Sequence, residues 1–368
     1  MKVILKENDL CFLAKINIFC FWKVIGYSCY WYSRKNVVMK KKNNTLDFIK
    51  AIACVMVLFI HINFPNEFGY YVSAIARFAV PFFFMVSGYF SYKKENDSVY
   101  IFRQLRKIII LSILSLLLYF IFSYIISIYN NDLFFIRNTF NFENLKYFIL
   151  FNSLPFGTHL WYLFSLIYVY IIYYIFKILF KNDKILYIFI PLLLIMCIII
   201  EYLVFSGFIF YQNIVIRNFL FIGLPFFMLG NLICKHKHSN FMMLLDNKIL
   251  FLTSVFGCLY SLFEAYCSTY MDLYFGSILF SVSIFIFCVK NENYICDDNI
   301  ICKFGRYYSL GIYIIHCIFI SIYNIFIYDI GDVFVQWCVP FVVLILSLIT
   351  VYSYYKIKNK LIYKLKKN

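Results

Sequence analysis

Charged residues are scarce in this chain. Asp, Glu, Lys and Arg make up 14% of its 368 residues, whereas ordinary soluble domains contain about a quarter. Hydrophobic residues make up 64%, and Phe and Tyr are abundant, with 46 and 34 copies. This composition excludes an ordinary soluble domain and indicates an all-α polytopic membrane protein, with aromatic side chains facing lipid and the membrane interfaces.

The sequence also lacks the cysteine patterns of metal sites and disulfide frameworks. Its 13 cysteines are scattered through apolar runs, with no CxxC motif and no paired Cys/His spacing. His236 and His238 lie in a basic loop, where charge that sets the membrane topology explains them better than a metal ion does. We therefore expect neither a metal nor a disulfide.

Acidic residues are outnumbered by basic ones, 18 to 34, which gives a formal net charge of +16. The basic residues lie in short loops between apolar runs, a pattern typical of membrane topology and not of a nucleic-acid-binding face. We expect ten membrane-spanning helices, each near the roughly 20 residues that a bilayer requires. They are predicted at 46–64, 71–91, 108–129, 160–180, 185–204, 217–234, 249–266, 273–289, 307–328 and 333–354.

The distribution of basic residues predicts the orientation of these helices. If residue 45 is cytoplasmic, nearly all basic loop residues lie on the cytoplasmic side. The outer loops hold little more than Arg137, Lys146 and Arg217. The positive-inside rule then places both termini in the cytoplasm, because an odd number of helices would leave the basic tail outside.

The chain divides into a leader, a membrane domain and a tail. Residues 1–38 are apolar but interrupted by lysines, and they lack the small-residue cleavage site of a signal peptide. Met39 precedes a run of lysines and resembles a natural start, so we expect the leader to be an over-extended start or a loose interfacial segment. The membrane domain is expected at 39–355, followed by a basic cytoplasmic tail at 356–368.

The first predicted helix carries three ionisable residues, which are costly inside a membrane. Lys50 and His61 are eleven residues apart, so they differ by about 20° around the helix axis and about 16 Å along it. Asp47 lies within about 40° of the same direction. All three therefore share one face. Alternatively, Asp47 and Lys50 form an i,i+3 ion pair at the interface, where His61 caps the helix.

The second predicted helix and the segment after it carry further candidates. Arg77 enters the helix without an acidic neighbour in sequence, and Pro81 removes a backbone donor and is expected to kink it. Ser87 precedes a glycine that permits close helix packing. Arg103 and Arg106 would form a clamp for the phosphates of a nucleotide-type cofactor if they are helical. Ordinary interfacial and cytoplasmic positive charge is the alternative for all three arginines.

Histidines also occur in two later helices. His159 opens the fourth predicted helix at its outer end, beside Trp161, which an aromatic belt explains. His316 lies about nine residues into the ninth, near mid-membrane. A buried histidine bonded to a carbonyl is the alternative there. Glu201 and Glu264 lie at outer helix ends, where we expect exposure at the interface.

These pieces, in this order, resemble the acyltransferase-3 family of ten-helix membrane O-acyltransferases that modify cell-envelope sugars. The resemblance covers about residues 43 to 355. A basic residue, ten residues and then a histidine resemble the first-helix signature of the family. The matching residues are Leu46-Asp47-Phe48-Ile49-Lys50 and His61; Arg77, Pro81-Phe82-Phe83 and Ser87-Gly88-Tyr89; Arg103 and Arg106; His159-Leu160-Trp161-Tyr162; and Ser309-Leu310-Gly311-Ile312-Tyr313 and His316.

The resemblance implies transfer of an acyl group, expected to be acetyl, from cytoplasmic acyl-CoA to a hydroxyl of a carbohydrate or a lipid-linked sugar. It makes His61 the catalytic base or a transient acyl carrier, and Lys50, Arg103 and Arg106 the donor-binding residues. Lys50 stands where Arg is commoner, and it supplies a point charge without a bidentate fork. The supporting residues are Asp47, Arg77, Ser87, His159, Trp161, Tyr313 and His316.

Transport of a polysaccharide or small molecule through the same polar cavity is the alternative function, and membrane sensing is a third. A carrier usually contains broken helices in symmetric repeats, and no repeat pairs Pro81 with Pro191. We expect the protein in the cytoplasmic membrane of a bacterium. Its expected partners are the bilayer, the two substrates, and either an envelope-biosynthesis protein or a second copy of the chain, with no nucleic acid.

Overall fold

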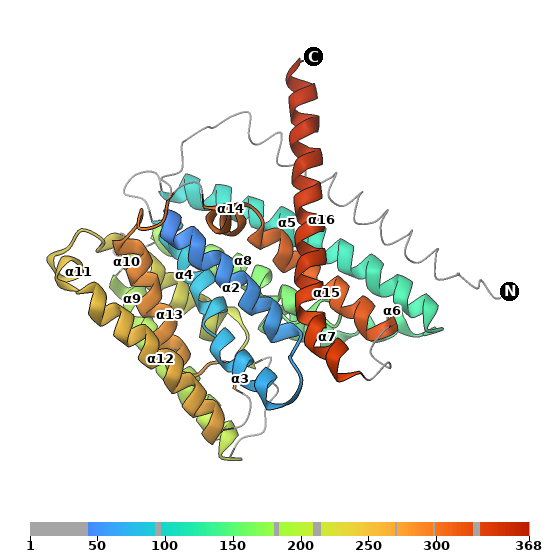
Figure 1. Cartoon of the computed structure of the whole chain (residues 1–368), viewed down its shortest axis with the longest axis horizontal. Coiled ribbons are helices and arrows are strands. Elements are labelled where there is room, and N and C mark those ends of the chain that lie inside the picture. Colours follow the sequence, from blue (N-terminus) through green and yellow to red (C-terminus); the bar gives the residue numbers. More distant parts are fainter. Residues whose placement is uncertain are drawn as a thin grey trace.

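The computed structural model describes residues 43–92, 97–179, 184–208, 215–268, 271–296, 299–326 and 332–367. Within these ranges the regular structure is helical and contains no strand, which confirms the all-α prediction (Figure 1). The predicted leader at 1–38 and the start at Met39 lie outside the described residues.

The order of the helices follows the predicted apolar runs. The elements are α2 (Asn44–His61), α3 (Asn66–Ala76), α4 (Ala79–Ser91), α5 (Asp97–Tyr129), α6 (Phe135–Thr139), α7 (Phe142–Phe151), η1 (Thr158–Leu160), α8 (Trp161–Leu179), α9 (Lys184–Phe205), η3 (Phe219–Gly223), α10 (Leu224–Lys235), α11 (Asn240–Leu244), α12 (Asn247–Cys267), α13 (Phe275–Lys290), α14 (Ile300–Tyr307), α15 (Ser309–Phe326) and α16 (Val333–Lys367).

Eight helical stretches of the described chain are long and apolar enough to cross a membrane, and two shorter apolar helices accompany them. The shorter ones are Phe219–Lys235 and Phe275–Lys290, and they coincide with the sixth and eighth predicted spans. The chain is therefore a polytopic helical membrane protein. The count of ten spans and the cytoplasmic position of both termini stay predictions.

The second span, Asn66–Ser91, is interrupted where the sequence predicted a kink. Helix α3 ends at Ala76 and α4 begins at Ala79. Pro81 has no backbone N–H and cannot bond the carbonyl four residues earlier, which belongs to Arg77. The break at Arg77 and Phe78 is therefore a direct consequence of Pro81.

Two helices extend beyond the predicted apolar runs. Helix α5 begins at Asp97 rather than at residue 108, so it includes Arg103 and Arg106. Helix α16 continues to Lys367, so the predicted tail from residue 356 is largely helical and projects beyond the other helices in Figure 1. Lys and Arg are good helix formers whose charged ends reach water from a helix that leaves the apolar layer. A run of hydrophobic residues therefore predicts the part of a helix that crosses the membrane, but it does not predict where the helix begins or ends.

Helix α2 packs against α14 and α15, and the contacts follow the same order along both segments. Arg306 contacts Asp47 near the start of α2, the Cys54 thiol bonds the Ser309 carbonyl further along, and the His61 and His316 rings meet at the end. A Cβ added at Gly305 would lie 1.9 Å from the Asp47 carbonyl oxygen. The absence of a side chain at Gly305 therefore permits this close approach.

The predicted exposure of Glu201 and Glu264 is wrong, because both are buried. Glu264 accepts the backbone N–H groups of Phe275 at 3.1 Å and Gly276 at 2.8 Å, at the first turn of α13. Glu201 accepts the N–H of Asp272 at 2.9 Å and a second N–H next to it. The first N–H groups of a helix have no partner within it, and these carboxylates satisfy groups at and before the start of α13.

Candidate functional site

Three histidines from distant parts of the chain meet at one end of α2. His61 is the last residue of α2, His316 lies in α15, and His159 lies in the short turn η1 that precedes α8. The ring centroids of His61 and His316 are 5.2 Å apart, and His159 lies 5.4 Å from His316 and 6.0 Å from His61. The sequence predicted each of these histidines separately, and the fold brings them together.

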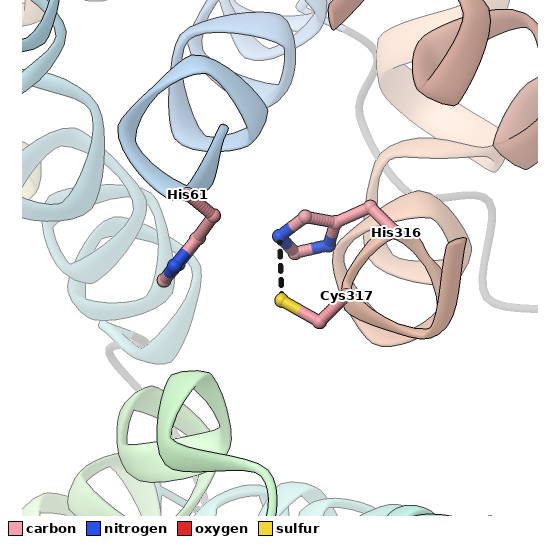
Figure 2. Close-up of side chains that lie close together, drawn as sticks. All are labelled: His61, His316 and Cys317. Atoms are coloured by element: carbon pink, nitrogen blue, oxygen red, sulfur yellow. Dashed lines mark hydrogen bonds between the residues drawn. The ribbon is translucent and has the colours of Figure 1, made fainter. Parts of the chain in front are cut away.

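A hydrogen bond to the backbone determines the tautomer of His316. Its Nδ1 lies 3.1 Å from the Ile312 carbonyl oxygen, which can only accept, so Nδ1 carries the hydrogen. In the neutral ring Nε2 is then an acceptor, and it lies 3.3 Å from the Cys317 sulfur; Figure 2 marks this contact with a dashed line. Cys317 donates its S–H to His316. The hydrogen bond to a carbonyl that the alternative for His316 described is therefore formed, while Nε2 faces the Cys317 sulfur.

A hydrogen bond and a ring contact hold His159 in place. The Tyr313 hydroxyl donates to the His159 carbonyl, and the Tyr119 ring lies 4.6 Å from the His159 ring. Gly157, two residues earlier, has a φ of +79°, which a residue without a Cβ adopts easily. The side chain of His159 is buried, and its Nε2 has no hydrogen bond in the described chain. The His159 Nε2 is therefore a ring nitrogen of the cluster that has no hydrogen-bond partner in the described chain.

Tyr119 belongs to this site and was missed by sequence reasoning. It lies in α5, is buried, and donates its hydroxyl to the Ile314 carbonyl at 2.7 Å. Nothing distinguishes one tyrosine among 34 in a sequence of this composition. Only the packing of α5 against η1 and α15 places its ring against His159.

A cluster of charged residues occupies the other end of α2. Asp47 accepts the Lys50 ammonium at 2.9 Å and the Arg306 Nε at 2.5 Å, with one carboxylate oxygen for each. Arg306 also donates to the Asn44 side chain at 2.7 Å. Burial acts against the charge of Arg306, but the hydrogen bond and negative charge of Asp47 outweigh it and raise the pKa of the guanidinium.

The i,i+3 ion pair that the sequence left as an alternative is therefore formed, and Arg306 is a third member that sequence reasoning missed. Lys50 and His61 lie in one uninterrupted helix, about 16 Å apart along its axis. The charged cluster and the histidine cluster thus lie at opposite ends of α2 and are two separate sites.

Arg77 has an acidic partner that is distant in sequence. Its guanidinium lies 3.2 Å from the Asp272 carboxylate, which Arg217 also contacts at 2.6 Å. Asp272 is buried before the start of α13, and no local pattern links it to Arg77. The positive charges of Arg77 and Arg217 also act electrostatically on His61.

Of the remaining predicted supporting residues, one contacts the histidine cluster and two pack beside it. Tyr313 contacts the histidine cluster through its hydroxyl and its ring. Trp161 follows His159 in the chain and packs its ring 6.2 Å from that of Phe84. Ser87 donates to the carbonyl of Phe83 in its own helix at 3.0 Å. These contacts join Tyr313 directly to the histidines, whereas Ser87 and Trp161 contribute to packing beside them.

Arg103 and Arg106 lie three residues apart in α5 and are helical, as the predicted clamp requires. Arg103 is half-buried and Arg106 is exposed, and neither forms an ion pair within the described residues. Among those residues no hydrogen bond or ion pair joins them to Lys50. Figure 1 draws the starts of α2 and α5 at the same end of the molecule. Their predicted shared role in donor binding stays a prediction.

Comparison with known proteins identifies one family. A family model described as an acyltransferase domain matches residues 43–356. No curated protein and no solved structure matches the chain significantly. The match covers α2 to most of α16, so it includes both the charged cluster and the histidine cluster.

Proposed function

Because the chain belongs to the acyltransferase-3 family and is a membrane protein, we propose that it transfers an acyl group from cytoplasmic acyl-CoA to a hydroxyl of a cell-envelope carbohydrate or lipid-linked sugar. Acetyl is the expected group, and the cytoplasmic membrane of a bacterium is the expected location. The observation that carries this proposal is the meeting of three histidines at the end of α2.

His61 is the proposed base of this reaction. An imidazole is well suited to accept a proton near neutral pH. His61 is half-buried, whereas His159 and His316 are buried, so His61 is the most accessible histidine of the cluster. The Nδ1 of His316 is committed to a carbonyl and the backbone of His159 to Tyr313. These two residues position the site around His61.

In the first route two proton transfers balance the reaction, one to His61 and one from it. The acceptor hydroxyl gives its proton to His61, and its oxygen attacks the carbonyl carbon of the thioester. The bond from carbonyl carbon to sulfur breaks, and the CoA thiolate leaves and takes up the proton from His61. In the second route a neutral His61 nitrogen attacks the thioester carbonyl, the bond to sulfur breaks, and the CoA thiolate leaves with the proton of the other ring nitrogen; the acceptor hydroxyl then takes the acyl group and returns its proton to His61. Both routes require a free nitrogen on His61.

Arg103 and Arg106 are the proposed contacts for the phosphates of the donor. Both lack an ion pair in the described chain, so their guanidinium groups are available for charge-assisted hydrogen bonds. Lys50 is paired with Asp47 and adds positive charge at the same end of α2 together with Arg306. The thioester arm of the donor would then extend about 16 Å along α2 to His61.

Acyl transfer from radiolabelled acetyl-CoA in isolated membranes tests the role of His61. We expect His61→Ala to abolish transfer at normal expression, because the base and acyl carrier is lost. His238→Ala is the matched control, since His238 is an exposed loop histidine, and it should retain full activity. Full transfer in His61→Ala would refute the proposal, and substrate movement without transfer would favour the transport alternative.

The donor site is tested by Arg103→Gln, which removes the charge and keeps a polar side chain. We expect the KM for the donor to rise by about tenfold or more, because a charge-assisted contact contributes about 1.5–3 kcal/mol. Arg137→Gln, at an exposed arginine of the short helix α6, is the control and should leave this KM unchanged. An unchanged KM in Arg103→Gln would assign Arg103 to membrane topology alone.

A further inference from the structure

We propose that His61, His316 and Cys317 form a binding site for a thiophilic divalent cation of the zinc type, and that occupation of this site inhibits the protein by engaging His61. The inhibitory consequence rests on the proposed function, whereas the metal site itself does not. The cysteine spacing predicted no metal site, because the residues that form this one come from α2 and α15 and follow no local motif.

The three side chains are close enough to share one ion. Their ligand atoms all lie within 4.8 Å of one another, and Figure 2 shows the three residues grouped between α2 and α15. In a tetrahedral zinc site, bonds of about 2.0–2.3 Å place neighbouring ligand atoms about 3.3–3.6 Å apart. The His316 Nε2 and Cys317 Sγ are already 3.3 Å apart. The separations involving His61 are at most 4.8 Å, so a side-chain rotation that moves its nitrogen by about 1 Å would complete the set.

The tautomer of His316 suits metal binding. Histidines that bind a metal usually donate their second ring N–H to a carboxylate or a backbone carbonyl, which orients the ring. His316 donates Nδ1–H to the Ile312 carbonyl at 3.1 Å, and its Nε2 lone pair points to the Cys317 sulfur. Two imidazole nitrogens and one thiolate form a ligand set that favours zinc over calcium or magnesium.

His159 provides an independent indication of a ligand. Its side chain is 97% buried, since it is 3% exposed, and yet its Nε2 has no hydrogen bond in the described chain. A buried polar atom without a partner is costly and requires an explanation. The ring lies 5.4 Å from that of His316 and 6.0 Å from that of His61. A metal-bound water beside the three ligands would supply this nitrogen with a partner.

The charges around the site determine which ligand set is needed. Arg77 and Arg217 act on His61 and oppose a second positive charge, although both are paired with Asp272. Cys317 therefore has to bind as a thiolate and lower the charge of the ion, and its proton is released to solvent. The site should consequently require the cysteine, and histidines alone should not retain the ion.

Metal binding and catalysis compete for one atom. The His61 nitrogen that accepts the proton of the acceptor hydroxyl is the atom that would bind the ion. Its lone pair serves one purpose at a time, so zinc should inhibit acyl transfer without displacing the donor from the arginines of α5. Cys317 has no role in the proposed reaction, and Ser at this position keeps an O–H that donates to His316.

The binding test uses the purified full chain in detergent, loaded with zinc and passed through gel filtration. We expect one retained zinc ion per chain in the wild type and in Cys338→Ser, at a half-buried cysteine of α16. Cys317→Ser should lose the ion, with affinity reduced by at least about tenfold. The variant His236→Ala/His238→Ala should keep it, which excludes the basic loop as the source.

Cobalt provides a second readout, because a cobalt–thiolate bond absorbs in the near ultraviolet and this band should vanish in Cys317→Ser. Zinc should inhibit transfer in the wild type and in Cys338→Ser, and Cys317→Ser should resist it. Absence of retained zinc in the wild type, or equal retention in Cys317→Ser, would overturn the metal site. Stoichiometric zinc in a protein whose His61→Ala variant still transfers acyl groups would overturn the proposed function and leave the metal site standing.

Discussion

Replacement of Asp47 by Asn removes one negative charge from between two cations. The carboxylate accepts Lys50 at 2.9 Å and Arg306 at 2.5 Å, and its side chain is 9% exposed. The cationic side chains are 15% and 18% exposed, so all three groups are mostly withdrawn from water. Asn keeps the shape of Asp but carries no charge, and its NH₂ group faces one cation with a donor instead of an acceptor.

The free-energy cost follows from the burial of the cluster. Breaking a buried ion pair from one side costs about 3–5 kcal/mol, whereas an exposed pair contributes about 0–1 kcal/mol. The two cations retain some contact with water, so we expect Asp47→Asn to lower the free energy of unfolding by about 2–3 kcal/mol. The loss should fall on the contact between α2 and α14, where Gly305 already requires close packing.

Thermal unfolding in detergent, followed with a thiol-reactive fluorescent dye, measures this effect. Cys54, Cys288 and Cys302 are buried, and each thiol bonds a backbone carbonyl at the contacts of α2 or its first turn, so the dye reports its separation from α13, α14 and α15. Asp132→Asn is the control, because Asp132 is exposed and forms no ion pair in the described chain.

We expect a lower Tm for Asp47→Asn and a change below about 0.5 kcal/mol for Asp132→Asn. The double variant Asp47→Asn/Arg306→Gln should lose less than the sum of the two single losses, since one unpaired cation is removed. Equal shifts in Asp47→Asn and Asp132→Asn would refute the reasoning.

Three further predictions concern packing and positioning. Gly305→Ala places a Cβ 1.9 Å from the Asp47 carbonyl oxygen and should lower stability by about 1–3 kcal/mol in the same dye assay; an unchanged Tm would contradict the close approach. Tyr313→Phe removes the hydroxyl bonded to the His159 carbonyl and should lower kcat about fivefold at unchanged donor KM, whereas a change in KM alone would argue against a positioning role. Glu264→Ala leaves two N–H groups at the start of α13 without their acceptor and should cost about 1–3 kcal/mol, measured by thermal unfolding; stability equal to the wild type would show that water replaces the carboxylate.

Errors of the sequence analysis occurred where local pattern and tertiary contact disagree. Glu201 and Glu264 lie at helix ends, and sequence position favoured exposure; each is buried because it accepts backbone N–H groups at or before the start of α13. The predicted helix began at residue 108, after the two arginines, because the strongly apolar run begins there. The observed helix α5 begins earlier, at Asp97. A hydropathy pattern represents neither the backbone N–H groups that these carboxylates bond nor the less apolar first turns of α5.

The partners of the charged residues also divide into local ones, which the sequence predicted, and distant ones, which it did not. The i,i+3 spacing of Asp47 and Lys50 is a property of one helix and was visible in the sequence. Arg306 and Asp272 were missed as partners because they are separated from Asp47 and Arg77 by well over a hundred residues. Cys317 was missed as a candidate metal ligand because only its short distance to two histidines identifies it as one.

The sequence by itself determined that this protein is helical and lies in a membrane, because a lipid interior admits only long apolar runs that satisfy their own backbone hydrogen bonds. It also determined the kink at Arg77, since Pro81 removes a donor at a known offset. The tertiary structure alone decided that His61 meets His159 and His316, while Lys50 and Asp47 meet Arg306. Helical periodicity describes one helix at a time, whereas a site is built from side chains on several, and their alignment depends on close contacts such as that of Gly305 with α2.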